Sequence, residues 1–292
     1  MYYLLYGFLY TLSLIPWRVL YFISDCVYVL IYYIFRYRRQ IVITNLVIAF
    51  PDKTEEERTK IAKEFYHNLI DTFIETLKLL STSDKEFSKR VSGNFDLLSS
   101  LHKTGQSVQL HSGHFFNWEF LNWAIAKYSP YTFIGVYLEI PNKALNKIML
   151  DLRARYNTLL VSTYTFKNTF HNLAKEQYVL GLAADQSAQP AKGYWVKFFG
   201  KLTPFVTGPE KGAVKNNTAV VFVHYYKIAR GRYHGDFELF TTRPLEFATG
   251  EITKKYLSYL EDCIRKKPAN YLWSHRRWKH EFRDEYKNNL YD

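Results

Sequence analysis

A histidine and an acidic residue share one short stretch of this sequence. Residues 110–119 read LHSGHFFNWE, so His114 and Glu119 stand five positions apart. An imidazole has an ordinary pKa of about 6.5 and can accept a proton near neutral pH, and a carboxylate can orient its ring and stabilise the charged form. These residue types predict a general base with a carboxylate partner.

The spacing limits how the two side chains can meet. Five positions on a continuous helix amount to a rotation of about 140°, so the side chains would point apart. They reach one site only if His114 lies in a loop, where Gly113 allows a sharp turn, and Glu119 lies in the first turns of the next helix. The alternative is a histidine at a strand end with a structural hydrogen bond, and His111 fits that description better than His114.

Three further charged residues are candidates for the same site. Asp185 follows the apolar run Gly181–Ala184 and could orient His114 in place of Glu119, or it could be a turn or cap residue. Arg153 and Arg155 lie near the end of an expected helix, and the guanidinium fork suits a phosphate or a developing oxyanion. The alternative for these two arginines is a solvated helix face.

Two aromatic segments remain open to more than one interpretation. The turns Phe198–Gly200 and Thr203–Phe205 could line a groove for an apolar ligand or serve as ordinary packing. The segment Trp273–Lys279 reads WSHRRWK and mixes aromatic with basic residues. Such a mixture could bind nucleic acid or lie at a lipid headgroup interface.

These residues need elements that position them, and the sequence beyond residue 105 alternates between strand and helix patterns. Expected strands are Ser107–Leu110, Thr132–Tyr137, Tyr178–Ala184 and Thr218–Tyr225, and expected helices are Phe116–Lys127, Lys143–Tyr156 and Lys167–Gln177. The alternation predicts an α/β fold with a largely parallel or mixed sheet flanked by helices. Ligands of such sheets bind beyond the carboxyl ends of the strands.

A long helix is expected before this region. Thr54 to Glu57 has the pattern of a capping box, in which the threonine hydroxyl and the glutamate carboxylate satisfy free backbone amides. Ile61, Phe65 and Leu69 follow at steps of four, which predicts an amphipathic helix running to about Leu80.

The N-terminal segment is the most apolar part of the chain. Residues 1–35 carry only Arg18 and Asp25 as charged residues, and Pro16 interrupts the run. The segment is compatible with one tilted transmembrane helix or with a kinked helix pair in one leaflet. The basic run Arg36–Arg39 predicts that the remainder faces the cytoplasm. We therefore expect a membrane anchor at 1–40 and a catalytic domain at 41–292.

Composition narrows the function classes without choosing one. The 292 residues are 48% hydrophobic, which argues against a disordered chain, and include 25 Tyr, 22 Phe and 6 Trp, which suit a membrane interface or an apolar ligand site. The formal charge of +12 favours an anionic partner such as a membrane surface, an acidic protein, a phosphorylated lipid or nucleic acid. Cys26 and Cys263 imply neither a disulfide framework nor a metal site.

Taken together, these segments resemble the bacterial lipid A biosynthesis acyltransferases, the late lauroyl and myristoyl transferases of the lysophospholipid acyltransferase superfamily. The resemblance covers nearly the whole chain: the N-terminal anchor, Asn45–Pro51, the His-x4-acid motif from His114 to Glu119, Asp185-Gln186, both aromatic turns and Trp273–Lys279. It adds Asn117, Gln186, His275 and Arg276 as motif positions. Asn157 departs from the family's usual glycine, but asparagine tolerates left-handed geometry.

The resemblance implies an acyl carrier protein thioester as donor and a hydroxyl of a lipid A precursor as acceptor, without a metal or organic cofactor. His114 would deprotonate the acceptor, with Glu119 or Asp185 orienting it, and transfer would be direct because no nucleophile elbow is present. Another glycolipid, an aminolipid or a lysophospholipid is the alternative acceptor. A membrane-anchored nucleic-acid-binding protein is a remote alternative, since no base-stacking or groove-reading module is found.

Overall fold

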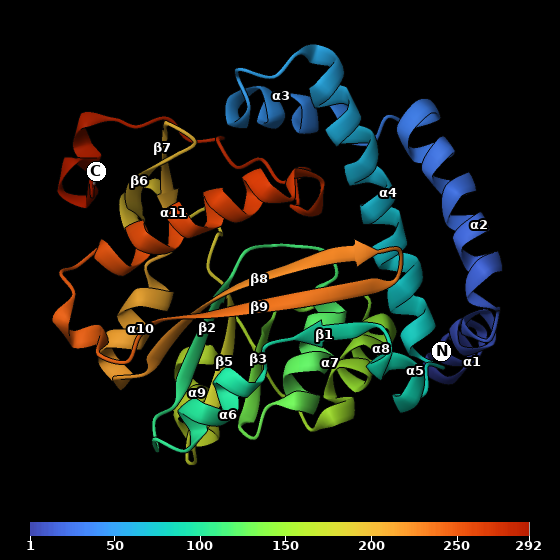
Figure 1. Ribbon diagram of the computed structural model, residues 1–292, viewed down its shortest axis with the longest axis horizontal. Coiled ribbons are helices and arrows are strands. Elements are labelled where there is room, and N and C mark those ends of the chain that lie inside the picture. The colour runs from blue at the N-terminus through green and yellow to red at the C-terminus, as the bar shows by residue number, and fades with distance from the viewer. Residues whose placement is uncertain (292) are drawn as a thin grey trace.

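The computed structural model describes residues 1–291, and a seven-stranded sheet forms the centre of the molecule (Figure 1). The strands lie in the order β1-β9-β8-β2-β5-β3-β4. Their bounds, in that spatial order, are Val91–Gly93, Arg232–Thr241, Ala219–Ala229, Val108–Ser112, Tyr178–Ala183, Thr132–Tyr137 and Leu159–Ser162.

Five of these strands confirm the expected parallel sheet. β8, β2, β5, β3 and β4 all run in the same direction, and only β9, which forms an antiparallel hairpin with β8, and β1, which is parallel to β9, run the other way. A second sheet is the hairpin of β6 (Tyr194–Phe198) and β7 (Lys201–Phe205). The fold is therefore a mixed α/β sheet, as the alternating pattern predicts.

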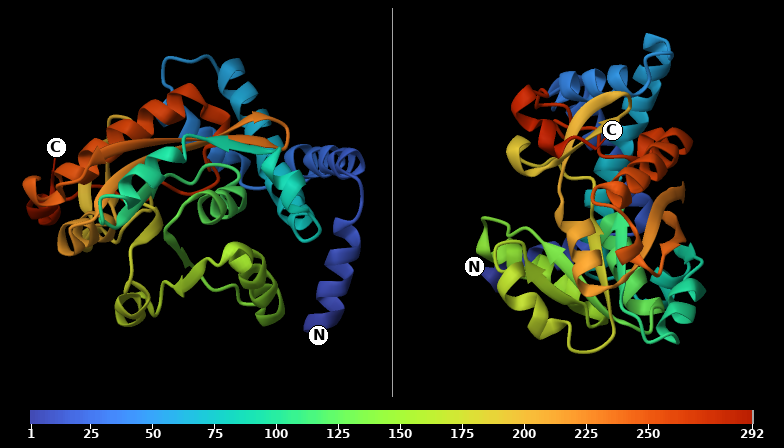
Figure 2. Two further views of the ribbon diagram at one scale, coloured as in Figure 1. Left: turned by 60° about the horizontal axis from the view of Figure 1, so that its bottom comes forward. Right: turned by 90° about the vertical axis from the view of Figure 1, so that its left-hand side faces the viewer.

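Helices cover both faces of the sheet (Figure 2). On the face of Leu110 and Val179, α6 (Asp96–His102) and α7 (Trp118–Tyr128) contribute to one apolar cluster. On the opposite face lie α9 (Phe166–Leu173), α10 (Gly208–Asn216) and α11 (Glu251–Lys266), whose apolar residues pack with strand residues such as Leu180 and Phe222. α8 (Lys143–Arg153) packs beside α7.

Most expected elements exist, with shifted ends. β2 continues to Ser112, so His111 lies inside the strand. α7 begins at Trp118 rather than at Phe116, because the Asn117 side chain accepts a hydrogen bond from the amide of Glu119 and acts as the cap. α8 ends at Arg153, and the one-turn 3-10 helix Ala154–Tyr156 follows it. Asn157 adopts the left-handed conformation with φ of 62°, so the turn survives without glycine.

The long amphipathic helix is α4 (Glu55–Leu79), and its capping box is present. Thr54 Oγ1 accepts from the amide of Glu57 at 3.2 Å, and the Glu57 carboxylate accepts from the amide of Thr54 at 2.8 Å. Glu57 has a lowered pKa because it accepts this backbone hydrogen bond, with Lys53 adding to the effect. α5 (Asp84–Ser88) then leads into β1.

The N-terminal segment forms α1 (Tyr2–Ser13) and α2 (Trp17–Val29), separated at Pro16, with a π-helical turn at Leu30–Ile34. Trp17–Ile34 is long and apolar enough to cross a membrane by length and composition. One side of α2 packs on α4, where Ser24 Oγ donates to Asp71 at 2.7 Å, and Asp25 pairs with Arg230 at 2.7 Å. Helix α3 (Arg39–Ala49) connects this region to α4.

Candidate active site

The register of two neighbouring strands brings His114 and Asp185 together. In β2 and β5, Ser112 lies opposite Ala183, and each candidate residue stands two positions beyond its member of this pair. The Nδ1 atom of His114 lies 2.6 Å from Oδ1 of Asp185, and the amide of His114 donates to Oδ2 at 3.3 Å. Because parallel strands end at the same edge, these side chains meet at the carboxyl edge of the sheet.

Asp185 is fully buried and is held by three side chains. Besides His114, the hydroxyl of Tyr271 donates to Oδ2 at 2.8 Å and Nη2 of Arg277 donates to the same oxygen at 2.9 Å. Burial alone would raise the pKa of this carboxyl, but the charges of His114 and Arg277 outweigh burial and hold the pKa well below its usual range. Asp185 is therefore a carboxylate anion at neutral pH, and it is hydrogen-bonded to Nδ1 of His114.

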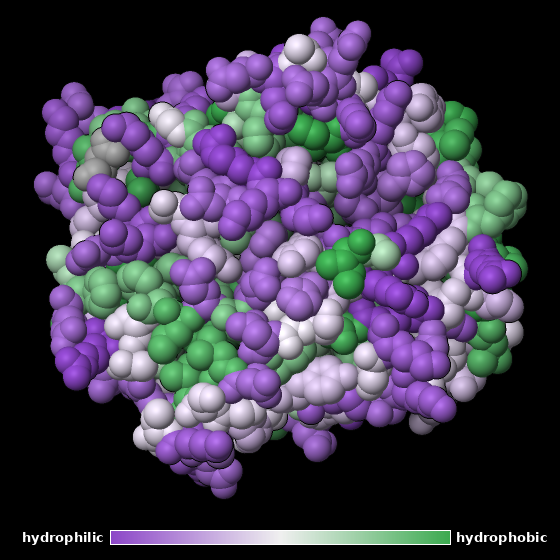
Figure 3. All heavy atoms as spheres, in the orientation of Figure 1, coloured by the Kyte–Doolittle hydropathy of each residue, from purple (hydrophilic) through white to green (hydrophobic). Residues whose placement is uncertain are grey.

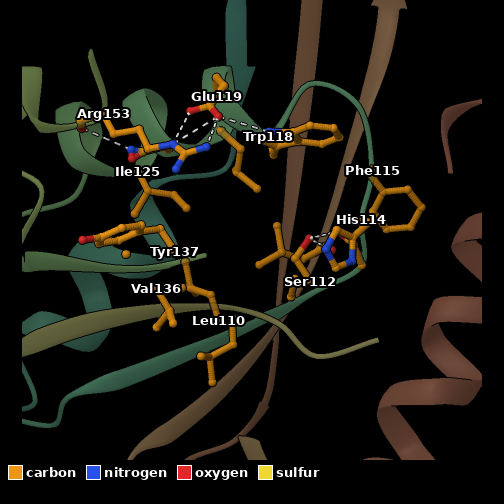
Figure 4. Close-up of a pocket in the computed structure, with 18 of the residues that line it drawn as sticks. Leu110, Ser112, His114, Phe115, Trp118, Glu119, Ile125, Val136, Tyr137 and Arg153 are labelled. Atoms are coloured by element: carbon orange, nitrogen blue, oxygen red, sulfur yellow. Dashed lines mark hydrogen bonds and ion pairs between the residues drawn. The ribbon is translucent and has the colours of Figure 1, made fainter. Parts of the chain in front are cut away.

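Glu119 has a different partner. Its carboxylate accepts from Nε of Arg153 at 2.9 Å and 3.1 Å, from Nη2 of Arg153 at 2.5 Å, and from the indole of Trp118 at 3.1 Å. Figure 4 shows the Glu119 carboxylate directed at Arg153 and away from His114. Of the two carboxylates that could have oriented His114, Asp185 is the one in contact with it, and Glu119 instead fixes the guanidinium at the end of α8.

The two candidate arginines lie in different places relative to the cavity beside His114. Arg153 lines the cavity beside His114, and its Nη1 makes no hydrogen bond to any described residue. Arg155 lies outside that cavity, donates to the carbonyl of Thr82 at 2.9 Å and stacks over Trp123 at 4.7 Å. Of these two candidates, Arg153 is thus the arginine that lines the chamber beside His114 with a free donor.

The remaining motif positions lie in different environments. The Asn117 amide donates to the buried carboxylate of Glu75 at 3.1 Å and thereby ties the start of α7 to α4. Gln186 lines two cavities that meet at His114. Burial lowers the pKa of His275 to about 4, so its ring is neutral at physiological pH, whereas Arg276 is exposed at the surface.

The C-terminal segment is anchored by the motif residue Asn45. Its Nδ2 donates to the carbonyl of Trp273 at 2.7 Å and to that of His275 at 2.8 Å. This contact joins α3 to the loop that carries Tyr271 and Arg277. Neither of these two residues is a candidate from sequence alone, and the only available signal was the tyrosine and arginine within and beside the Trp273–Lys279 block.

A cavity of about 460 Å³ opens next to His114 on the face of α7. Its wall is mostly apolar and includes Leu110, Ile125, Phe133, Leu160 and Val223. The polar groups include His114 on one side of the cavity and the Glu119–Arg153 pair on another (Figure 4). An apolar chamber with a few polar groups at its mouth suits a long hydrocarbon chain with a reactive end.

The aromatic turns do not contribute to this chamber. Phe198 and Phe205 lie on β6 and β7, are fully buried, and belong to the apolar cluster beneath α11. Of the two interpretations open from sequence, ordinary packing describes these residues.

His111 occupies the opposite face of β2 from the chamber. It is buried against Phe222 and Tyr256, and its ring shares a hydrogen bond of 3.2 Å with the side-chain amide of Gln109. Burial lowers the pKa of this imidazole to about 3. The packing fits a structural role for His111.

This buried histidine should make folding sensitive to mild acid. The unfolded chain binds a proton at residue 111 below pH of about 6.5, whereas the folded chain does so only near pH 3. The neutral His111 ring therefore makes its full contribution to the free energy of unfolding at neutral pH. That free energy falls by about 2 kcal/mol between pH 7.5 and pH 5. In chemical denaturation, the free energy of unfolding should depend less on pH for His111→Gln than for the wild type. His171 is exposed, so His171→Gln should show the same pH dependence as the wild type. Parallel profiles for His111→Gln and wild type would contradict this account.

Fold and site together define an α/β protein in which a buried aspartate binds a partly exposed histidine at the carboxyl edge of the sheet, with an apolar chamber beside the pair. The sequence model of the family described as bacterial lipid A biosynthesis acyltransferase matches residues 1–280. The chain belongs to this family, whose members act in lipid A biosynthesis as acyltransferases. None of the curated proteins compared with the chain matches it.

Proposed function

We propose that this acyltransferase moves a fatty acyl group from an acyl carrier protein thioester to a hydroxyl of a lipid A precursor, as a late acylation. The observation that supports the proposal most strongly is the contact between His114 and Asp185 at the mouth of an apolar chamber. The chamber can hold the acyl chain, and the histidine stands where the chain's reactive end would lie. The family supplies the class of acceptor, a lipid A precursor or a related glycolipid.

In the proposed mechanism, His114 acts as the general base. Asp185 binds Nδ1, so Nε2 is the nitrogen that takes the proton of the acceptor hydroxyl. The oxygen attacks the thioester carbonyl as its proton leaves, and a tetrahedral intermediate forms. Its collapse breaks the carbon–sulfur bond, and the proton on Nε2 passes to the departing sulfur. The Asp185 carboxylate stabilises the imidazolium that exists between these two proton transfers.

Glu119 takes a supporting role in this proposal. Its hydrogen bonds to Nε and Nη2 hold the guanidinium of Arg153 at the cavity wall with Nη1 free. A fixed donor in this position can bind a phosphate of the acceptor or the oxygen that becomes negative during attack. Arg155 is not assigned a part in the reaction, because its side chain lies against Thr82 and Trp123.

We further propose that the N-terminal helices anchor the enzyme in the cytoplasmic leaflet of the inner membrane. The outward side of α1 and α2 is strongly apolar, with Leu4 81% and Phe22 69% exposed, and hydrophobic residues gather at the edge where α2 lies (Figure 3). The inward side of α2 pairs through Asp25 with Arg230, a charged residue of the catalytic part. A full span would carry this ion pair toward the bilayer centre, where charges are costly. The in-plane arrangement avoids that cost.

The acceptor is tested by the lipids of cells that lack the gene. Deletion should yield lipid A lighter by one acyl chain in mass spectra, with simple phospholipids unchanged. The wild-type gene should restore the chain, and the His114→Ala gene should not. Unchanged lipid A together with loss of a chain from another glycolipid or an aminolipid would reject the proposed acceptor and leave acyl transfer in place.

A further inference from the structure

The sheet divides at its carboxyl edge beside the catalytic chamber. β3 and β5 are paired from Thr132 and Tyr178 only as far as Gly135 and Gly181, although both strands continue for two more residues. Beyond that point β3 stays paired with β4 as far as Tyr137, and β5 stays paired with β2 as far as Ala183. A crevice between β3 and β5 results.

This crevice lies where the connections of the fold change sides. The chain leaves β3 toward α8, on the side of the chamber, whereas β5 leads toward α10, on the opposite face. In open α/β sheets, neighbouring strands whose connections leave to opposite faces form the crevice in which ligands bind. Val136 and Leu182, which follow the last paired residues of β3 and β5, line both the chamber and a second groove on the far face, so the two cavities are adjacent at the crevice.

The second groove is larger than the chamber and has a distinct chemistry. Its volume is about 1310 Å³, and its floor is apolar, formed by residues such as Phe166, Phe170 and Leu180. Its rim carries three lysines, Lys167 on α9 and Lys211 and Lys215 on α10, together with His171. All four side chains are exposed, and no acidic residue lies among the described residues that line the groove. An uncompensated basic rim favours an anionic partner.

We propose that this groove docks the acidic carrier of the acyl thioester, and that the carrier's phosphate-bearing arm reaches the chamber through the β3–β5 crevice. The inference rests on the proposed function, because it assumes a thioester donor attached to a protein. A folded carrier is too large for a chamber of about 460 Å³, so only a slender arm can bring the thioester to His114. The lysines match both the phosphodiester of the arm and an acidic carrier surface.

The geometry also separates the two substrates. The chamber opens on the face of α7, and the groove opens on the face of α9 and α10. Donor and acceptor could therefore approach His114 from opposite sides of the sheet without passing one another. The small residues Gly135 and Gly181 border the crevice, and a Cβ at Gly181 would meet the Phe133 ring at 2.9 Å.

Charge reversal on α10 tests the docking surface. In the full-length protein, Lys211→Glu/Lys215→Glu should raise KM for the carrier-bound thioester about tenfold or more while kcat changes little. The same variant should use a carrier-free, phosphate-free acyl-pantetheine thioester as well as the wild type does. Lys85→Glu/Lys89→Glu on and beside α5 changes the net charge equally at exposed positions outside the groove and should leave both reactions unchanged.

Disulfide trapping tests the path of the arm. In a Cys26→Ala background, where Cys263 is buried, Leu182→Cys should couple to a carrier whose arm thiol is activated as a mixed disulfide. Lys85→Cys should not couple, and Lys211→Glu/Lys215→Glu should suppress coupling at residue 182.

The proposal is overturned if charge reversal leaves the donor KM unchanged, or if it raises KM for the lipid acceptor instead. It is also overturned if Leu182→Cys couples to the carrier equally well with and without the charge reversal. None of these results affects the proposed function, which fails if His114→Ala remains active, if no thioester is used, or if deletion of the gene leaves lipid A unchanged.

Discussion

His114→Ala is expected to lower kcat for acyl transfer by about 10²–10⁴-fold, because the acceptor hydroxyl then loses the base that takes its proton. The fold should survive, with a change in unfolding free energy of no more than about 1–2 kcal/mol. The His114 side chain is 28% exposed at the cavity, and Asp185 keeps Tyr271 and Arg277 as partners when the ring is removed.

The measurement is a single-turnover assay beside a thermal unfolding curve. His280→Ala is the matched control, since its imidazole lies outside the described cavities. Activity above about a tenth of wild type in His114→Ala would remove this residue from the role of general base, because general-base catalysis contributes more than that.

The second large effect is expected at Asp185. Asp185→Asn should reduce kcat by about 10²–10⁴-fold, since a neutral amide neither stabilises the imidazolium nor holds the ring in the tautomer that leaves Nε2 free. The variant should also lose stability, by about 3–5 kcal/mol, because the Arg277 guanidinium remains buried without its counter-charge.

A double variant separates the loss of activity from the loss of stability. Asp185→Asn/Arg277→Met removes the buried cation together with its partner and should recover much of the lost stability, because both charges of the pair are gone. Its activity should remain as low as that of Asp185→Asn. Recovery of activity along with stability would mean that Asp185 serves the fold alone and that His114 works without it.

The stability difference should depend on pH in a defined direction. The folded-state pKa of Asp185 is depressed by His114 and Arg277 despite burial, so its stabilising contribution is complete above the ordinary aspartate pKa of about 4. That contribution disappears only as the pH falls through the depressed folded-state value. Wild type and Asp185→Asn should thus differ most at neutral pH and converge in strong acid.

The sequence alone determined the local parts of the molecule. The Thr54–Glu57 pattern predicted a capping box and a helix from there to about Leu80, and the observed helix ends at Leu79. Thr132–Tyr137 was predicted with its observed ends, and His114 was expected just beyond a strand. Such features depend on residues only a few positions apart in the sequence. Helix capping and the helical and strand repeats of apolar residues are local properties of the chain.

The sequence did not define several other elements. β8 corresponds to the expected strand Thr218–Tyr225, but its partner β9, helix α11 and the small sheet of β6 and β7 have no counterpart among the expected elements. β9 mixes polar and apolar residues, and its place is set by pairing with β8 from Arg232 to Thr241 rather than by its own pattern. Most of the helix ends moved by a few residues because caps such as Asn117 decide them.

Only the tertiary structure decided the partnership at the site. From spacing, Glu119 and Asp185 were both possible partners of His114, and the nearer residue in sequence is the one that turned away to Arg153. Asp185 lies 71 positions from His114, and Arg277 lies 92 positions from Asp185. The register of β2 against β5 and the path of the C-terminal loop bring these three residues into contact. Such contacts depend on which strands become neighbours, and strand order leaves no periodic signal in the chain.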